Sequence, residues 1–146
     1  MEDRSALVGT RLPSYSFTVE RGKIKEFAAA IGDLKEGYLN PVKAARAGYA
    51  DVIAPPTYAT VISHWGGMGF HELCDHLKLN RVMILHGGQE FEYLGDIAAG
   101  DVITVETLLS GYAEKKNMHV LTMDSVYLNQ RGEEVLRSRS LMLEMK

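Results

Sequence analysis

Three side chains of this 146-residue sequence could transfer protons at a shared site, namely Asp33, Tyr38 and His86. Carboxylates and imidazoles commonly act as general acid and base, and a phenol can donate a proton when its pKa is strongly lowered. Each group also has a structural interpretation. Asp33 follows the helix-ending Gly32 and could cap a turn, Tyr38 could pack with its hydroxyl on a neighbour, and His86 could make a structural hydrogen bond. If the chain performs acid–base chemistry alone, we expect Asp33 to act with Tyr38 or His86.

The other reactive groups indicate neither a metal nor a cofactor. Cys74 is the only cysteine, so an internal disulfide is excluded and a reducing compartment is favoured. His71 and His76 flank it, but a fourth ligand and the usual zinc spacing are missing. The glycines at 66, 67 and 69 lack the Gly-Lys-Ser/Thr end of a phosphate-binding loop and are expected to end a helix. We therefore expect no metal and no cofactor.

Two further histidines have structural interpretations only. His64 falls in an apolar stretch that we expect to form a buried helix, so its predicted role is that of a satisfied core or interface residue. His119 falls in a strand-like run, and we expect it at the surface of that strand. Neither residue is a predicted member of the functional site.

The composition is typical of a globular protein. Hydrophobic residues make up 46%, charged residues 24%, and the net charge is -3. A basic stripe that would bind nucleic acid is missing, the apolar runs are too short to span a bilayer, and residues 1–6 have no apolar signal region. We expect one cytoplasmic domain over residues 1–146, with neither a nucleic-acid nor a membrane partner.

Hydrophobic periodicity predicts the order of the elements. Residues 15–20 alternate as a strand, and residues 23–31 carry an amphipathic helical pattern that ends at Gly32. Pro41 could start a short helix through residue 47. Residues 58–68, after Pro55-Pro56, are apolar on most faces and predict a buried helix. Four strands are expected near residues 82–94, 101–112, 118–128 and 134–145.

This order favours an α+β domain in which an antiparallel sheet wraps round one long buried helix, the hot-dog arrangement. A sheet covered in this way leaves an edge strand with unpaired backbone groups. Such domains often pair sheet to sheet across a two-fold axis. We therefore expect the chain to form a dimer.

Several motifs in the same order resemble the MaoC-like dehydratase family, in its N-terminal or FAS1-type branch. Ile31-Gly32-Asp33 matches the start of the pattern, Ala44-Ala45-Arg46 followed by Gly48-Tyr49 matches its middle, and Ala54-Pro55-Pro56-Thr57-Tyr58 matches its end. The later runs are residues 85–93, which include His86-Gly87-Gly88, and residues 99–102. The resemblance covers nearly the whole chain.

The resemblance implies reversible addition of water to a trans-2-enoyl thioester of coenzyme A or acyl carrier protein. Active members use the Asp and His of a Gly-Asp-x-Asn-Pro-hydrophobic-His motif, and a backbone N–H of a His-Gly pair polarises the thioester carbonyl. Here Asp33 is retained, but the histidine falls on Tyr38. The His-Gly pair falls on Pro55-Pro56, and proline has no N–H to donate. The catalytic set is therefore incomplete in this sequence.

Three functions are compatible with these residues. The favoured one is a dehydratase-family subunit that binds the acyl chain and works with a catalytic MaoC-like partner. The second is a homodimeric hydratase with a rearranged site, and the third is a hot-dog thioesterase or a non-enzymatic acyl-thioester binder. The residues for which the resemblance implies substrate contact are Pro55, Pro56, Thr57, Tyr58, His86, Gly87 and Gly88.

Overall fold

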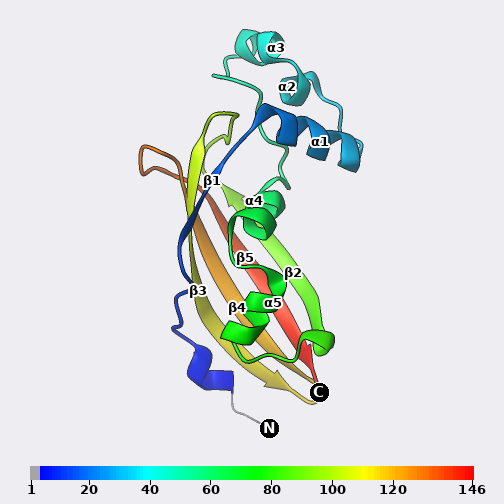
Figure 1. Cartoon of the computed structure of the whole chain (residues 1–146), viewed down its shortest axis with the longest axis vertical. Coiled ribbons are helices and arrows are strands. Elements are labelled where there is room, and N and C mark those ends of the chain that lie inside the picture. The colour runs from blue at the N-terminus through cyan, green and yellow to red at the C-terminus, as the bar shows by residue number, and fades with distance from the viewer. Residues whose placement is uncertain (1–3) are drawn as a thin grey trace.

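Five antiparallel strands form one sheet in the spatial order β1-β3-β4-β5-β2. They are β1 (Tyr15–Thr18), β2 (Ile84–Tyr93), β3 (Val102–Lys115), β4 (Met118–Leu128) and β5 (Glu134–Met145). The consecutive strands β3, β4 and β5 make the long centre of the sheet, and β1 and β2 are its edges (Figure 1). This computed structural model describes residues 4–146. Residues 1–3, at the start of the segment searched for a signal sequence, lie outside the described residues.

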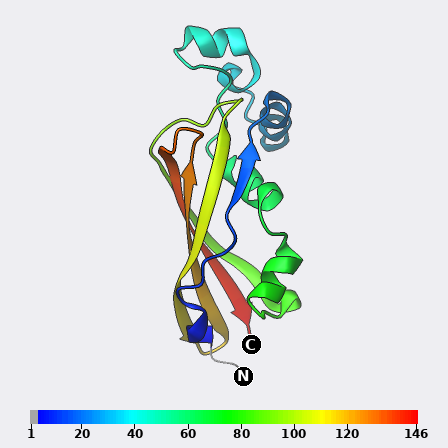
Figure 2. The same cartoon turned by 60° about the vertical axis from the view of Figure 1, so that its left-hand side comes forward.

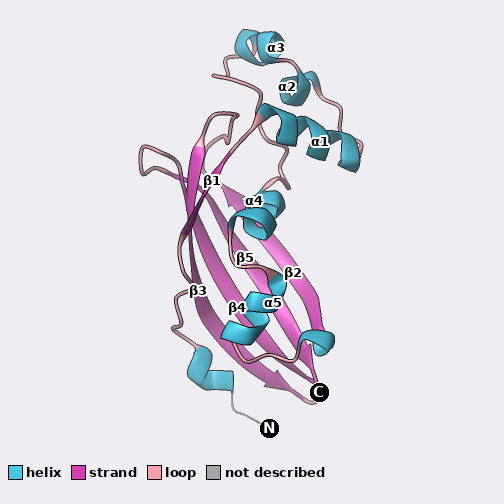
Figure 3. Cartoon of the chain, viewed as in Figure 1, coloured by secondary structure: helices cyan, strands magenta, loops and turns pink. Residues whose placement is uncertain are grey.

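The helices lie on one face and at one end of this sheet. They are α1 (Arg21–Ile31), α2 (Glu36–Leu39), α3 (Pro41–Arg46), α4 (Ala59–Gly66) and α5 (Phe70–His76), with short 3-10 turns η1 (Arg4–Leu7) and η2 (Arg81–Met83). Figures 1 and 2 show α4 and α5 lying along the same face, while α1, α2 and α3 gather at one end. Figure 3 separates the helical layer from the strand layer by colour. The predicted α+β class is confirmed.

Local sequence explains the first two predicted helices. Ile24 and Ala28 are fully buried on one side of α1, and Gly32 ends the helix with a left-handed φ of 73°. The prediction of this helix is confirmed, with a start two residues earlier. α3 begins at Pro41 as expected. The Asn40 side chain caps it by accepting hydrogen bonds from the N–H groups of Val42 and Lys43.

The prediction of one long central helix is wrong. α4 has only eight residues, and Gly67 leaves the helix in an extended conformation before α5 begins. The cause is a close approach of the chain to the Tyr15 ring of β1. A Cβ atom would lie 2.9 Å from that ring at Gly66 and 2.6 Å from it at Gly67. The glycines allow this contact and end the helix there.

The helical layer is also less buried than the sequence indicated. Trp65 of α4 is 78% exposed and His64 is exposed, so only part of α4 packs on the core. The sequence did not predict α5. This helix places the buried Cys74 in a core cluster with Leu109 and Leu121 from the sheet, and burial raises the pKa of the Cys74 thiol.

The strand predictions hold best in the second half of the chain. β4 and β5 have the predicted bounds, whereas β3 continues three residues further and β1 stops two residues earlier. β2 begins later than expected because η2 occupies residues 81–83. Its register against β5 shifts between His86 and Gly88, so Gly87 is the extra residue of a bulge. A Cβ atom on Gly87 would lie 2.7 Å from Cγ of Leu143.

The surface position predicted for His119 is wrong. The residue is 4% exposed, and its Nδ1 lies 2.8 Å from the Tyr112 hydroxyl. On β4 it shares a side with Leu121 and Met123, because alternate residues of a strand point the same way. Both of those neighbours belong to the core cluster around Cys74. His119 is therefore an inward residue at the start of its strand.

The glycine contact with Tyr15 leads to a stability prediction. We expect Gly67→Ala to lower the free energy of unfolding by about 1–3 kcal/mol, because the added methyl overlaps the Tyr15 ring. Gly22→Ala is the control, since that position in α1 has open space around its Cβ, and its stability should stay the same or rise. Urea unfolding of both variants measures the difference. Equal stability of Gly67→Ala and the parent protein would contradict the packing argument.

Candidate functional site

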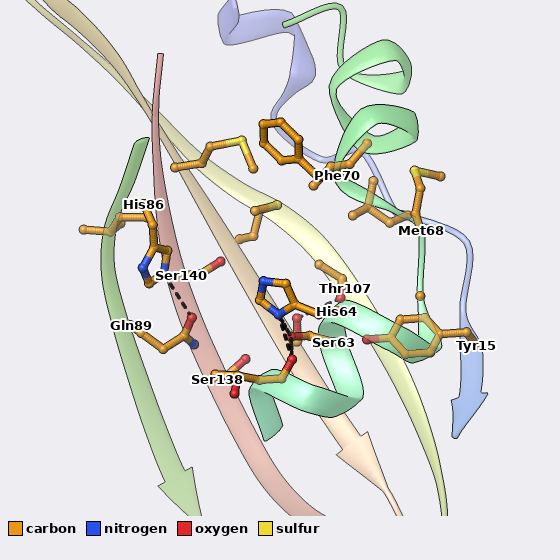
Figure 4. A pocket seen from close by; sticks show the side chains of 18 of the residues that line it. Tyr15, Ser63, His64, Met68, Phe70, His86, Gln89, Thr107, Ser138 and Ser140 are labelled. Carbon is orange, nitrogen blue, oxygen red and sulfur yellow. Dashed lines mark hydrogen bonds between the residues drawn. The ribbon is translucent and has the colours of Figure 1, made fainter. Parts of the chain in front are cut away.

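A hollow lies between the helices α4 and α5 and the sheet. It has a volume of about 510 Å³ and opens to solvent (Figure 4). Its walls come from both layers and from the segment before β1. The lining residues are Leu12, Pro13, Tyr15, Thr60, Ser63, His64, Gly67, Met68, Phe70, Leu73, Ile84, Leu85, His86, Gln89, Phe91, Thr107, Met123, Ser125, Tyr127, Ser138, Ser140, Leu141 and Met142.

The floor of this cavity is a set of cross-strand rows. Thr107 pairs with Ser125, Ser125 with Ser138, and Ser138 with Phe91, so one row crosses β3, β4, β5 and β2. Directly paired residues of antiparallel strands share a face, and three hydroxyls therefore lie in line. The hydroxyls of Thr107 and Ser125 are 2.7 Å apart and hydrogen-bonded. We call Thr107, Ser125 and Ser138 the hydroxyl row.

Apolar side chains line the part of the cavity near α5. Met123 and Met142 come from the sheet, Phe70 and Leu73 come from α5, and Ile84 begins the edge strand. Methionine side chains adapt to irregular apolar ligands. A cavity of this size with apolar walls and a few polar groups is typical of a small-molecule site.

The phenols of Tyr15 and Tyr127 line the cavity beside the hydroxyl row. Burial raises the pKa of Tyr15 well above its usual range, and the neighbouring Tyr127 adds to the shift. Burial likewise raises the pKa of Tyr127, whereas a hydrogen bond with Ser138 acts in the opposite direction. Both phenols therefore stay protonated and neutral near pH 7, where they can donate or accept hydrogen bonds.

His64 points from α4 into the cavity (Figure 4). Its Nδ1 lies 2.7 Å from the carbonyl oxygen of Thr60, one turn back on the same helix. A carbonyl can only accept, so Nδ1 carries the hydrogen, and in the neutral ring Nε2 is left as an acceptor. Within residues 4–146, Nε2 has no hydrogen-bond partner. The sequence interpretation missed this residue, because His64 was placed on a fully buried helix.

His86 lines the same cavity from β2. Its Nε2 lies 3.4 Å from Oε1 of Gln89, and both side chains are exposed at the sheet edge (Figure 4). The two glycines that follow His86 are not among the lining residues, and Gly87 forms the bulge that turns the strand. Substrate contact by Gly87 and Gly88 stays a prediction.

Asp33 and Tyr38 lie away from this cavity. Asp33 follows α1, where its carboxylate is 3.3 Å from the ammonium of Lys35. The same ammonium lies over the Tyr38 ring at 5.7 Å. Tyr38 is 6% exposed and belongs to the core cluster beneath α1 and α4. The structure therefore does not bring either residue together with His86, and their catalytic roles stay predictions.

Four predicted substrate-binding residues lie in the segment just before α4. Pro55, Pro56 and Tyr58 line a second hollow of about 430 Å³, which Tyr38, Tyr93 and Asp96 also line. Thr57 lines neither hollow, and its carbonyl accepts a hydrogen bond of 2.7 Å from the Thr60 hydroxyl. The set predicted from the resemblance is thus divided, with only His86 at the larger cavity.

Among the described residues, Tyr58 carries a buried polar atom that has no hydrogen-bond partner. Its side chain is fully buried against Phe17 and Phe27, and its hydroxyl has no hydrogen-bond partner within residues 4–146. Burial, followed by the charges of Glu20 and Glu26, raises the pKa of this phenol to about 12. The group is therefore neutral at all ordinary pH values.

Two further features of the described residues bear on other functions. Within residues 4–146, His, Cys, Asp and Glu side chains nowhere form a group of three or more that could hold a metal ion. Among the helices of the same residues, none has both the length and the apolar character that a membrane crossing requires.

Known proteins similar to this chain agree with the geometry. Residues 6–138 match a family described as FAS1-like, dehydratase domain region. A protein of Thermobifida fusca named UPF0336 is 36% identical over 127 residues, which cover 87% of this chain and 83% of that protein. Its name assigns no activity.

Solved structures give the fold. The HadBC (3R-hydroxyacyl-ACP dehydratase) complex of Mycobacterium tuberculosis contains a chain with a TM-score of 0.79 and 22% identity, covering 94% of this chain and 96% of that one. A MaoC-like dehydratase superposes with a TM-score of 0.84 and 20% identity, covering 99% of this chain but 44% of that one. The fold is therefore hot-dog-like, with a five-stranded antiparallel sheet and a broken helical layer.

The buried phenol of Tyr58 leads to a second prediction. We expect Tyr58→Phe to raise the free energy of unfolding by about 1 kcal/mol, because it removes a buried hydroxyl that has no partner. Tyr112→Phe is the control and should be destabilising, since that hydroxyl lies 2.8 Å from Nδ1 of the buried His119 and is hydrogen-bonded to it. Urea unfolding at pH 7 compares the two. A loss of stability in Tyr58→Phe would mean that its hydroxyl is satisfied in solution.

Proposed function

Because the chain belongs to the FAS1-like dehydratase domain family, we propose that it is the acyl-binding subunit of an (R)-specific enoyl-thioester hydratase, or 3-hydroxyacyl-thioester dehydratase. The observation that carries the proposal is the chemistry of the cavity. Its lining includes two histidines and many apolar and hydroxyl groups, but none of its residues is Asp, Glu, Lys or Arg. An acyl chain fits such walls, whereas an Asp–His pair for water addition cannot form there.

The positions of the family motif support a binding role. Asp33 lies outside the cavity beside Lys35, and Tyr38 occupies the position of the family histidine. Pro56 has no N–H to donate to a thioester oxygen. The proposed ligand is the acyl group of a coenzyme A or acyl-carrier-protein thioester, and the reacting carbons then lie in a partner's catalytic site.

The proposed partner is a second hot-dog subunit that carries the Asp and His. Among the strands of residues 4–146, β2 is an edge of the sheet and pairs with β5 alone. Just before this strand Val82 exposes 86% of its surface, and within the strand Leu85 exposes 54%. Exposed apolar groups beside an unpaired strand favour association. The alternative is a homodimer through the same edge, within the cytoplasmic location expected from the sequence.

The proposal predicts that the purified chain alone does not hydrate crotonyl-coenzyme A. The measurement is the loss of enoyl absorbance, with the mass in solution determined on the same sample. Addition of a catalytic MaoC-like subunit that forms a mixed dimer should restore turnover. Rapid hydration by a homo-oligomer, or a mixed dimer that forms and stays inactive, would reject the accessory role.

Filling the apolar part of the cavity tests acyl binding directly. We expect Ile84→Trp to weaken binding of dodecanoyl-coenzyme A about tenfold or more, with a much smaller effect on acetyl-coenzyme A, because the indole occupies space that a long chain needs. Val82→Trp is the control, since Val82 is 86% exposed and outside the lining. Isothermal titration calorimetry gives both affinities. Equal dodecanoyl affinity for the two variants would place the acyl site elsewhere.

A further inference from the structure

The hydroxyl row lies between apolar rows on the inner face of the sheet. On one side lies the row of Val105, Tyr127 and Leu136, and on the other side lie Leu109 and Met123. An unsubstituted acyl chain in the cavity would cover these hydroxyls and remove their water without offering a hydrogen bond. Such burial is unfavourable for each polar group that loses its partner.

The side chains around the hydroxyl row offer both hydrogen-bond donors and an acceptor to the cavity. Thr107 and Ser125 share one hydrogen bond, which uses one O–H and leaves the other as a donor. The side-chain hydroxyl of Ser140, which pairs across the strands with Met123, makes no hydrogen bond within residues 4–146. His64 adds an acceptor from the opposite wall, because Thr60 fixes the hydrogen on Nδ1 and Nε2 points away from its own helix. Donors and an acceptor therefore line the middle of one cavity.

From this arrangement, and resting on the proposed function, we propose that the cavity binds an acyl thioester that carries a hydroxyl group on the chain, away from the reacting carbons. The ligand hydroxyl donates to Nε2 of His64 and accepts from a hydroxyl of Ser138 or Ser140. The apolar part near Met123 and Met142 holds the chain beyond that hydroxyl. A keto group in the same place could accept from the serines but could not donate to His64.

Matched ligands test this specificity. The probes are dodecanoyl-coenzyme A and its 3-hydroxy, 7-hydroxy, 12-hydroxy and 7-keto derivatives, titrated into the full chain by calorimetry. The 7-hydroxy ligand should bind at least tenfold more tightly than the parent, because it satisfies groups that a methylene leaves unpaired, whereas the 12-hydroxy ligand has no chain beyond its hydroxyl and should not gain. The 7-keto ligand should bind more weakly than the 7-hydroxy ligand.

Two substitutions assign the effect to the named residues. His64→Phe and Ser138→Ala should each reduce the affinity ratio of hydroxylated to parent ligand by about tenfold. His76→Phe is the matched control, because that exposed histidine of α5 is outside the cavity lining, and it should leave the ratio unchanged. Thermal unfolding shows whether each variant is folded, and Ser138→Ala keeps the test decisive if His64→Phe does not fold.

The outcomes separate this inference from the proposed function. Tight binding of dodecanoyl-coenzyme A with no gain from a distal hydroxyl, or a gain from the 3-hydroxy ligand alone, would overturn the hydroxyl subsite and leave acyl binding intact. Failure of all five ligands to bind would overturn both proposals. A distal-hydroxyl preference that survives in both His64→Phe and Ser138→Ala would also overturn the assignment to these residues.

Discussion

The contact between the end of α4 and the ring of Tyr15 determines how the helical layer lies on the sheet. Two glycines let the backbone approach the aromatic ring, and the helix cannot continue through that point. The chain leaves the sheet and returns to it as α5, seven residues that pack on a separate core cluster. Because the two helices touch the sheet at two places, the space between them stays open. The cavity is therefore a result of the broken helix.

The sheet supplies the chemistry of this cavity through its register. Four neighbouring strands each contribute one side chain to a row. The hydrogen-bonded register of the strands therefore fixes the relative positions of Thr107, Ser125, Ser138 and Phe91. The helical wall contributes His64, whose tautomer is fixed by its own helix. A rigid floor and a rigid wall thus present polar groups in fixed positions, and such preorganisation lowers the entropy cost of ligand binding.

The sequence predicted the strands well and the site only in part. β4 and β5 follow alternating patterns that need no tertiary information, and their bounds are as expected. The central helix was predicted too long because the apolar run does not reveal a steric contact with Tyr15, more than 40 residues earlier in the chain.

The hydroxyl row depends on strand register, which periodicity within one strand does not give. The alternation of Leu136, Ser138, Ser140 and Met142 was the available signal that serines point inward. Asp33 and Tyr38 were chosen by resemblance to a motif, and the structure places both outside the cavity.

The lack of formally charged side chains in the cavity lining has a consequence for how binding responds to its medium. Transfer of an acyl tail into uncharged walls involves no ion pair, so dissolved salt has little to screen there. The phosphates of a carrier, by contrast, interact with surface charges that salt does screen. The binding affinity therefore has two contributions that differ in their dependence on ionic strength. The contribution of the acyl tail persists at high salt, whereas the contribution of the carrier phosphates decreases.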